Sequence, residues 1–268
     1  IRAMNSGPLP HVDEDFDRYF PTQADGTRRA ARFLEAGEPG GLLYGMTAFM
    51  GGSEVTRQEK ALLLAAARVV VGSGESFRSR FDNFYYFSPT NRLVMFTPDQ
   101  PEKISFYRDK APADFDVGRT QMMQMTLPAA NPSRETRCTK LLPLLSDPTG
   151  RTMTTGCMTP IYVNGRHVGA WGTTLPINSY LLEAVQETRP GTVNLIVDAS
   201  GALIAYPGFA GPGAATPAVL AQYEAEYRLH ELAAAIRSRK VTSGVAQAAG
   251  GKYLAAFGHI EGPDWYFL

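Results

Sequence analysis

Two stretches far apart in the chain share one pattern of apolar runs separated by turn-forming residues. The first has apolar runs at 84–87 and 93–96, and the second at 194–197 and 203–206. Short apolar runs around a four-residue turn segment predict β-hairpins. Gly201 lies where a type I turn with a bulge needs a positive φ, and Asp198 can accept hydrogen bonds from the turn backbone.

The two hairpins form an internal repeat. Phe87 matches Val197, Ser88 matches Asp198 and Asn91 matches Gly201, all at an offset of 110 residues. A repeat of this size indicates that the chain holds two copies of one structural module.

Further hairpins are predicted after each copy. The flanking runs and their turns are 141–145 and 153–159 around 147–150, 161–163 and 168–174 around Asn164-Gly165, and 252–260 and 265–268 around 261–263. Asn-Gly is a strong hairpin turn. Both halves of the chain are therefore expected to be antiparallel meanders.

Helices are predicted at three places. Thr56 and Glu59 fit a capping box at the start of a helix over about 57–71, which is apolar nearly all round and therefore expected to be buried. Thr216-Pro217 begins a second helix that runs past Ile236 and ends in basic residues. Residues 13–36 have a looser helical pattern.

Composition narrows the class of protein. The 268 residues carry 26 Lys plus Arg and 26 Asp plus Glu, so there is no net field to attract nucleic acid or anionic lipid. The longest apolar run, 61–71, contains Arg68 and is shorter than the roughly 20 residues that cross a bilayer. The chain starts at Ile1 and stops within the aromatic run 264–268, and we interpret it as a fragment of a longer protein.

Several segments resemble the double Cache domain, the extracytoplasmic sensing part of bacterial transmembrane receptors. They are Asn194–Pro207, Asp147–Arg151, Met158–Tyr162, Gly165 and Val168–Gly172. The resemblance covers about residues 80–268 and implies an α+β fold with two PAS-like modules in tandem, each an antiparallel sheet with flanking helices. The implied organisation is a helical region over 1–75, a membrane-distal, ligand-binding module over 76–185 and a membrane-proximal module over 186–268.

The same resemblance implies a function. The chain is expected to be the periplasmic or extracellular portion of an inner-membrane histidine kinase, diguanylate cyclase or chemoreceptor. It would bind a small solute in the distal module and signal through its terminal helices, in a parent that is anchored by segments outside this chain and can form a homodimer. The alternative is a protein-interaction or dimerisation module with a vestigial pocket.

One departure from the family bears on the ligand. Members that bind amino acids have an aspartate at the position of Thr174 and an Arg-x-Trp-Tyr segment upstream, and this chain has neither. The ligand is therefore expected not to be a typical α-amino acid.

Candidate ligand-binding residues follow from the resemblance, which assigns the stretch before Asp147 to a lid and one pocket wall. In that stretch we select Tyr107, Arg108, Arg119 and Met123. Arginine can clamp a carboxylate or phosphate with two hydrogen bonds, and methionine forms an adaptable apolar wall. The alternatives are solvent-exposed loop arginines and a methionine that only fills the core.

Two threonines and the two cysteines lie on predicted strands. Thr155 and Thr174 offer hydroxyls to a ligand, although threonine is also common in strands for its β-propensity alone. With Pro148-Thr149 at the turn centre, Cys138 is opposite Thr159 and diagonal to Cys157. The two sulfurs are then close enough either for a disulfide in an oxidising compartment or for two buried thiols.

Motifs for catalysis and metal binding are absent from the sequence. The four histidines are scattered, with no paired His or Cys at metal-ligand spacing, and there is no Gly-x-Ser-x-Gly elbow. We therefore expect no cofactor, no metal and no enzymatic activity in this chain, and the motif search disfavours a secreted hydrolase.

Overall fold

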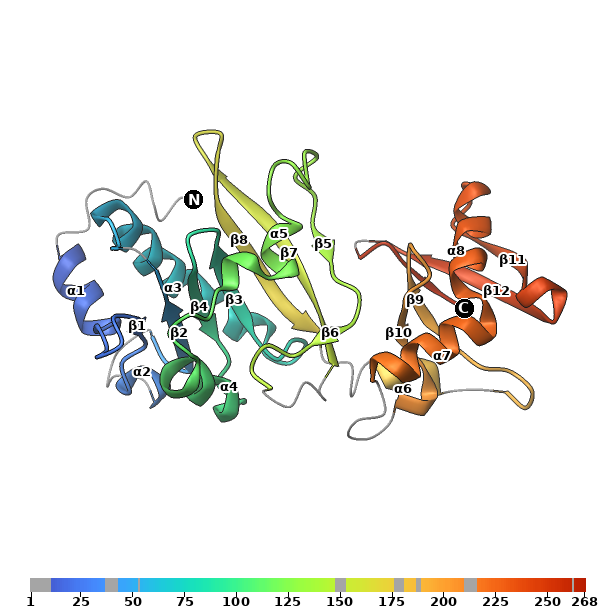
Figure 1. Ribbon diagram of the computed structural model, residues 1–268, viewed down its shortest axis with the longest axis horizontal. Coiled ribbons are helices and arrows are strands. Elements are labelled where there is room, and N and C mark those ends of the chain that lie inside the picture. The colour runs from blue at the N-terminus through green and yellow to red at the C-terminus, as the bar shows by residue number, and fades with distance from the viewer. Residues whose placement is uncertain are drawn as a thin grey trace. The chain divides into compact units, whose positions relative to one another are not determined.

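The computed structural model describes residues 11–36, 43–52, 54–147, 153–175, 181–186, 189–209, 216–261 and 263–268 (Figure 1). The chain divides into two compact units. One consists of residues up to Glu135 together with Met158–Thr174, and the other of Thr136–Cys157 together with Leu175–Leu268.

The first sheet has eight strands in the order β1-β2-β4-β3-β8-β7-β5, with β6 paired to β7. The pairs β1–β2, β2–β4, β3–β4, β3–β8 and β6–β7 are antiparallel. The strands are β1 (Arg28–Arg29), β2 (Met46–Met50), β3 (Phe84–Ser88), β4 (Arg92–Phe96), β5 (Arg137–Cys138), β6 (Leu142–Pro143), β7 (Met153–Val163) and β8 (Arg166–Leu175).

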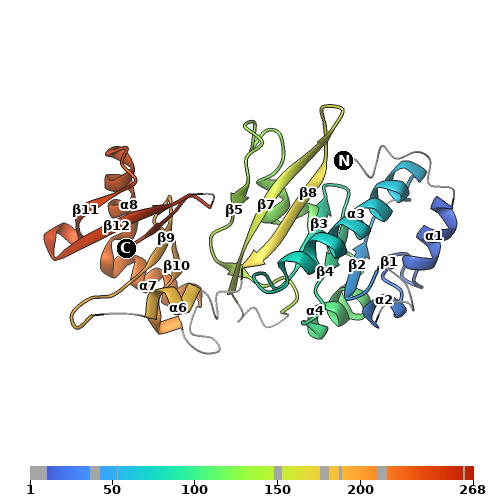
Figure 2. The ribbon, with the colours of Figure 1, turned by 180° about the vertical axis from the view of Figure 1, so that it is seen from behind.

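The longest helix, α3 (Arg57–Phe77), begins at the predicted capping box. The Thr56 hydroxyl accepts the Glu59 amide, and the Glu59 carboxylate accepts the Thr56 amide. The helix continues six residues past the predicted end, and its buried residues pack with Tyr86, Val94 and Phe96 in one hydrophobic cluster. Figure 2 shows α3 lying across one face of the strands β2, β3 and β4.

The opposite face carries shorter segments: α4 (Pro101–Ser105), a π-helical turn at Phe106–Lys110, a 3₁₀ turn at Val117–Arg119 and α5 (Gln121–Gln124). Residues 11–36 form α1 (Val12–Tyr19), β1 and α2 (Phe33–Ala36) rather than continuous helix. The strands β1 and β2 thus join the first sheet from within residues 1–75.

The two repeated hairpins match in register and in turn geometry. Phe87 pairs with Leu93 in one, and Val197 pairs with Leu203 in the other. The equivalent turn residues Asn91 and Gly201 have φ of 61° and 91°. Residue Ser88 accepts the Thr90 amide through its hydroxyl, as Asp198 accepts the Ser200 amide through its carboxylate.

The remaining hairpins follow the sequence pattern. Asn164 and Gly165 have φ of 50° and 77° between β7 and β8, as a two-residue type I′ turn requires. The strands β12 and β13 pair across 261–263. The predicted turn at 147–150 falls mostly outside the described residues, although β6 and β7 pair beside it.

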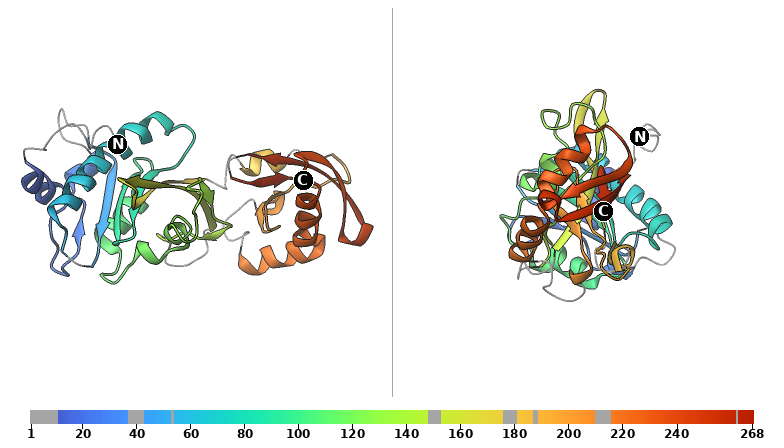
Figure 3. Two further views of the ribbon diagram at one scale, coloured as in Figure 1. Left: turned by 90° about the horizontal axis from the view of Figure 1, so that it is seen from above. Right: turned by 90° about the vertical axis from the view of Figure 1, so that its right-hand side faces the viewer.

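The second sheet has five strands in the order β10-β9-β13-β12-β11. They are β9 (Ile196–Asp198), β10 (Leu203–Ala205), β11 (Ser243–Ala248), β12 (Tyr253–Ile260) and β13 (Trp265–Phe267). The helices of this part are α6 (Leu182–Gln186), α7 (Pro217–Tyr227) and α8 (Leu229–Ser238). In Figure 3 the orange helices α7 and α8 lie on one face of this sheet.

The helix predicted to run from Pro217 past Ile236 is two helices. Arg228 has a φ of 50°, which ends α7 in a left-handed cap. The break lets the start of α8 lie against the hairpin turn, where a Cβ on Gly201 would be 2.5 Å from the carbonyl oxygen of Leu229. The predicted α+β fold with two antiparallel sheets and flanking helices is confirmed. The prediction that both halves are meanders was wrong, because strands that are not consecutive in the chain, such as β3 and β8 or β9 and β13, are neighbours in the sheets.

Candidate functional site

A row of polar residues crosses the first sheet just past the paired ends of β3 and β4. Phe84 pairs with Phe96, and Tyr85 pairs with Gly172. Continuing the first register by one residue and the second by two places Asn83 between Thr97 and Thr174. The Thr174 amide donates to Oδ1 of Asn83 at 2.9 Å, and all three residues are buried.

This row lies on the sheet face that α3 does not cover. Residues two apart in a strand share a face, so Asn83 lies on the side of Tyr85, while Tyr86 packs in the cluster that includes α3. The hydroxyl of Tyr85 donates to Sδ of Met122 at 3.6 Å. Burial is the main cause that raises the pKa of this phenol, so Tyr85 is a neutral hydrogen-bonding group beside the row.

Helix α4 is held against this face. Thr47 pairs with Met95, so its hydroxyl lies on the Tyr85 face, and it donates to the carbonyl oxygen of Ile104 in α4 at 3.1 Å. The same short helix begins after Gln100 and carries Lys103, whose side chain is only 5% exposed. We call Asn83, Thr97, Gln100, Lys103 and Thr174 the polar row.

Three groups of the polar row have no partner among the described residues. They are the buried Nδ2 of Asn83, the buried Oε1 of Gln100, and the ammonium of Lys103, a residue that is 5% exposed. Burial is the main cause that lowers the pKa of Lys103, and the charges of Asp82 and Glu102 act in the opposite direction. A buried polar group without a partner destabilises a fold by about 1–3 kcal/mol, and more if it is charged.

The arrangement suits a small polar ligand. A buried ammonium and an amide N–H donate, an amide oxygen accepts, and hydroxyls of Tyr85 and Thr174 can do either. A ligand with an anionic group and a hydrogen-bonding group would satisfy atoms that the protein itself leaves open.

Tyr107 and Met123, both predicted as site residues, are buried in the first unit. Tyr107 belongs to the π-helical turn, is 3% exposed, and has its pKa raised by burial. The turn is tied to β1 because Arg29 donates to the carbonyl oxygens of Tyr107 at 3.4 Å and Ala111 at 2.7 Å. Met123 is fully buried in α5.

The two predicted arginines already have carboxylate partners. Arg108 pairs with Glu35 and with Asp109, and these contacts raise its pKa while lowering that of Asp109. Arg119 pairs with Asp116 at 3.1 Å and its side chain is 88% exposed. The structure thus does not place either guanidinium in the polar row.

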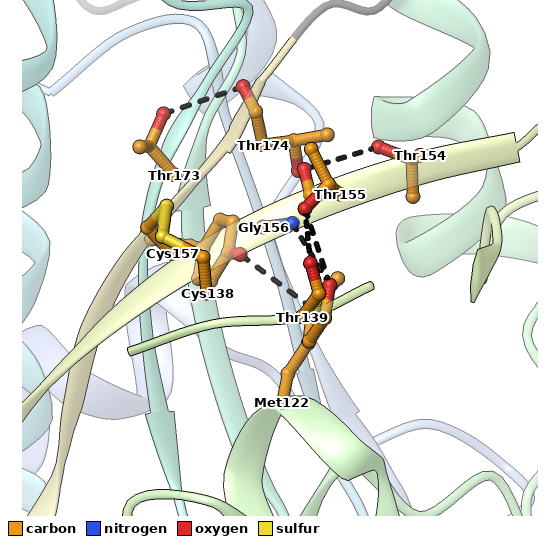
Figure 4. The surroundings of a disulfide bond; sticks show 10 residues. Met122, Cys138, Thr139, Thr154, Thr155, Gly156, Cys157, Thr173 and Thr174 are labelled. Carbon is orange, nitrogen blue, oxygen red and sulfur yellow. Dashed lines mark hydrogen bonds between the residues drawn. A yellow bond between two sulfur atoms is a disulfide. The ribbon is translucent and has the colours of Figure 1, made fainter. Parts of the chain in front are cut away.

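Thr155 lies with the cysteines in the second compact unit, whereas Thr174 belongs to the first. The Thr155 hydroxyl donates to the carbonyl oxygen of Thr139 at 2.6 Å (Figure 4). Cys138 and Cys157 form a disulfide. The Thr139 amide donates to the carbonyl oxygen of Gly156, so Cys138 is directly opposite Cys157 and not opposite Thr159 as predicted.

The sequence reasoning missed Asn83, Gln100 and Lys103. Asn83 carried a usable signal, because the predicted hairpin register already placed it level with Thr97. Lys103 carried no such signal in the sequence. Lysine is rarely buried, and the burial of Lys103 depends on α4 folding back onto β2. Among the described residues, no group of three or more His, Cys, Asp or Glu is placed to hold a metal ion. Within the same residues, no helix is both long and apolar enough to cross a membrane.

Comparisons with known proteins give similarities to solved structures only. No family model and no curated protein matches the sequence. The ligand-binding domain of the Pseudomonas aeruginosa PAO1 amino acid chemoreceptor PctC, in complex with GABA, is 15% identical with a TM-score of 0.47, over 75% of this chain and 79% of that one. The ligand-binding domain of the Pseudomonas fluorescens chemoreceptor CtaA, in complex with L-isoleucine, is 18% identical with a TM-score of 0.48, over 75% and 73%.

These structures are ligand-binding domains of chemoreceptors, one of the receptor types that the sequence resemblance named. They also correct one expectation. Similar domains are in complex with L-leucine, L-alanine, L-valine, L-glutamine and L-serine, so the exclusion of α-amino acids as ligands was wrong. It relied on Thr174 lacking a carboxylate, but an ammonium group can be held by other acceptors, and Oε1 of Gln100 is one that is open here.

Proposed function

We propose that this chain is the extracytoplasmic ligand-sensing domain of a bacterial transmembrane receptor and that the polar row of the first unit binds the solute. The double Cache resemblance of residues 80–268 and the two antiparallel sheets support the class of domain. The observation that carries the ligand site is the pair of buried, unpartnered atoms on Asn83 and Gln100, together with the largely buried residue Lys103.

The proposal assigns a role to each group. The Lys103 ammonium would face an anionic group of the solute, and a charge-assisted hydrogen bond there would be stronger than a neutral one. Nδ2 of Asn83 would donate to the solute and Oε1 of Gln100 would accept from it. Tyr107 and Met123 would form the apolar wall, and Arg29 would hold the turn that carries Tyr107.

Signalling then requires differential affinity. A ligand shifts a receptor between two states only by the difference in its binding free energy for them. Because α4 and the turn after it carry Lys103 and Tyr107, ordering of this segment around the ligand is the change that we propose to be transmitted to the terminal helices.

A thermal-shift screen tests the site directly. The probes are acetate, propionate, γ-aminobutyrate, L-alanine and L-leucine, with putrescine as a cation that Lys103 should reject. A probe at 100 times its Kd should add about 2.7 kcal/mol to the free energy of unfolding. The stabilisation should disappear in Lys103→Gln and persist in Lys110→Gln, an exposed lysine seven residues further on.

The second candidate function is a protein-interaction or dimerisation module. This function would be supported if none of these probes changes the melting temperature while a partner protein or a change in protein concentration does. Stabilisation that is equal in Lys103→Gln and in the unsubstituted protein would place the ligand elsewhere in the chain.

A further inference from the structure

A cavity lies in the first unit, formed by segments that the proposed ligand site does not use. It is open to solvent, has a volume of about 230 Å³, and is lined by residues that include Thr22, Gly26, Arg28, Gly52, Glu54 and Lys60. This volume corresponds to roughly seven or eight water molecules in the liquid, which suits a solute of a few heavy atoms.

Arg28 lines this cavity, and only one of its guanidinium nitrogens has hydrogen-bond partners among the described residues. Its Nη1 donates to Asp17 at 2.7 Å and to the carbonyl oxygen of Phe20 at 2.9 Å. Nε and Nη2 have no hydrogen-bond partner among the described residues, and together they form the edge of a guanidinium that binds a carboxylate with two parallel hydrogen bonds. The planar group also lies over the ring of Phe16, 5.2 Å from its centroid, which fixes its orientation.

Lys60 adds a second positive charge over the same ring. Its Nζ is 5.5 Å from the Phe16 centroid and donates to Asp13 at 2.8 Å, with Asp17 at 3.9 Å. The Lys60 and Arg28 side chains are only 16% and 23% exposed, so both charges are partly shielded from water.

Three cations and three carboxylates lie at or beside the cavity, and the two least exposed of these six groups, Arg28 and Lys60, are cations. Arg57 also contacts Asp13, so three cations, Arg28, Arg57 and Lys60, share two carboxylates. Glu54 adds a third carboxylate at the cavity. Glu54 is exposed and the Arg57 side chain is 73% exposed, so solvent screens both charges better than those of Arg28 and Lys60.

From this geometry we infer that the cavity beside Arg28 and Lys60 is a second binding site, separate from the polar row, for a small carboxylate solute. The carboxylate accepts two hydrogen bonds from Nε and Nη2 of Arg28 and a third from Lys60. Gly26 and Gly52, with φ of 80° and 82°, stand at the cavity with open space where a side chain would be, which leaves access to the two cations.

The test is an NMR titration of the isotopically labelled chain with sodium propionate at constant ionic strength. Saturable shifts are expected at the amides of Gly26 and Gly52 and at the Nε–H of Arg28. Arg28→Lys should weaken the affinity measured at these amides by about tenfold or more, because an ammonium cannot make the bidentate pair. Arg119→Lys, an exposed arginine with its own carboxylate partner, is the matched control and should leave the affinity unchanged.

Two further variants keep the result interpretable. Thr22 lines the cavity and forms an isolated β-bridge with Arg28, so Thr22→Phe should occupy the space beside the Arg28 guanidinium and abolish the shifts even if Arg28→Lys fails to fold. Lys103→Met, which removes the cation of the polar row, should leave the shifts at Gly26 and Gly52 intact. Shifts that stay linear in propionate, or that saturate equally in Arg28→Lys and Thr22→Phe, would overturn the second site.

Discussion

Asn83 and Thr174 are joined by a hydrogen bond that uses only half of the Asn83 side chain. Oδ1 accepts the Thr174 amide at 2.9 Å, while the buried Nδ2 has no partner. The bond connects β8 to the segment before β3, and it fixes the orientation of the amide so that its open N–H₂ group belongs to the polar row.

We expect Asn83→Ala to lower the free energy of unfolding by about 1–3 kcal/mol, because the buried Thr174 N–H loses its acceptor. Asn83→Asp keeps an acceptor at the same place and should lower the free energy of unfolding by a smaller amount. Urea unfolding followed by circular dichroism measures both values. Equal losses in the two variants would show that the hydrogen bond to Thr174 is not the stabilising feature.

Lys103→Met should stabilise the protein in the absence of ligand and remove ligand binding. Methionine has a similar length and no charge, so the substitution removes a buried ammonium that has no ion-pair partner among the described residues. The melting temperature should therefore rise, whereas in the exposed control Lys110→Met it should change little. A fall in melting temperature would mean that the Lys103 ammonium stabilises the fold and is not held for a ligand.

The stability of the ligand-free protein should rise with pH on the alkaline side of neutrality. The folded-state pKa of Lys103 lies below its ordinary value of 10.5, so between the two values the unfolded chain binds more protons than the native protein. Deprotonation then favours the folded state as the pH increases toward 10.5. Chemical unfolding at a series of pH values below about 9.5, where tyrosines in the unfolded chain are still protonated, measures the slope.

That slope should be smaller in Lys103→Met, which has no group to titrate there. Above pH 10 the trend should reverse, because burial raises the pKa values of Tyr85 and Tyr107 and the unfolded chain then loses its phenolic protons first. An identical slope below pH 9.5 in the two proteins would assign the effect to groups other than Lys103.

The fold could be predicted from sequence where local chemistry decides it. The turns at Asn91, Gly165 and Gly201 need a positive φ, and the residues there identify the hairpins and their registers. The capping box at Thr56 located the start of α3 for the same reason. The break at Arg228 could not be predicted, since arginine has no preference for the left-handed region and only packing against the Gly201 turn explains it.

The candidate site could be predicted only in part, because its chemistry depends on contacts between distant segments. Lys103 is buried because Thr47, 57 residues before Ile104 in the chain, holds α4 on the sheet. Arg108 and Arg119 have the right chemistry for an anion, but Glu35 and Asp116 pair with them, and the pairing with Glu35 spans 73 residues. Sequence spacing alone does not reveal which cation is left without a carboxylate.

Replacing both cysteines, as Cys138→Ser with Cys157→Ser, should lower the free energy of unfolding by about 3 kcal/mol. The disulfide closes a loop with a sequence separation of 19 residues, and most of its effect is expected from restricting the unfolded chain. Reductant should destabilise the unsubstituted protein by a similar amount and leave the double variant unchanged. Alkylation of two thiols in the denatured, unreduced protein would show instead that the bridge does not form.

Arg29→Met should loosen the segment that carries Tyr107. Arg29 is 4% exposed and donates to the carbonyl oxygens of Tyr107 and Ala111 and to the carboxylate of Asp25. Losing these bonds leaves buried carbonyl oxygens unpaired, and we expect a loss of about 3 kcal/mol in the free energy of unfolding.

Hydrogen exchange at the amides of 106–111 should also become faster in Arg29→Met. Without the Arg29 hydrogen bonds to the turn, local opening of the turn costs less free energy. Arg32→Met is the matched control, since Arg32 is 78% exposed and pairs with Asp109 on the surface. Surface ion pairs contribute about 0–1 kcal/mol, so this variant should remain close to the unsubstituted protein. Equal exchange rates at 106–111 in the two variants would mean that Arg29 does not anchor the turn and that the position of Tyr107 is set by its aromatic neighbours Phe106 and Phe115 instead.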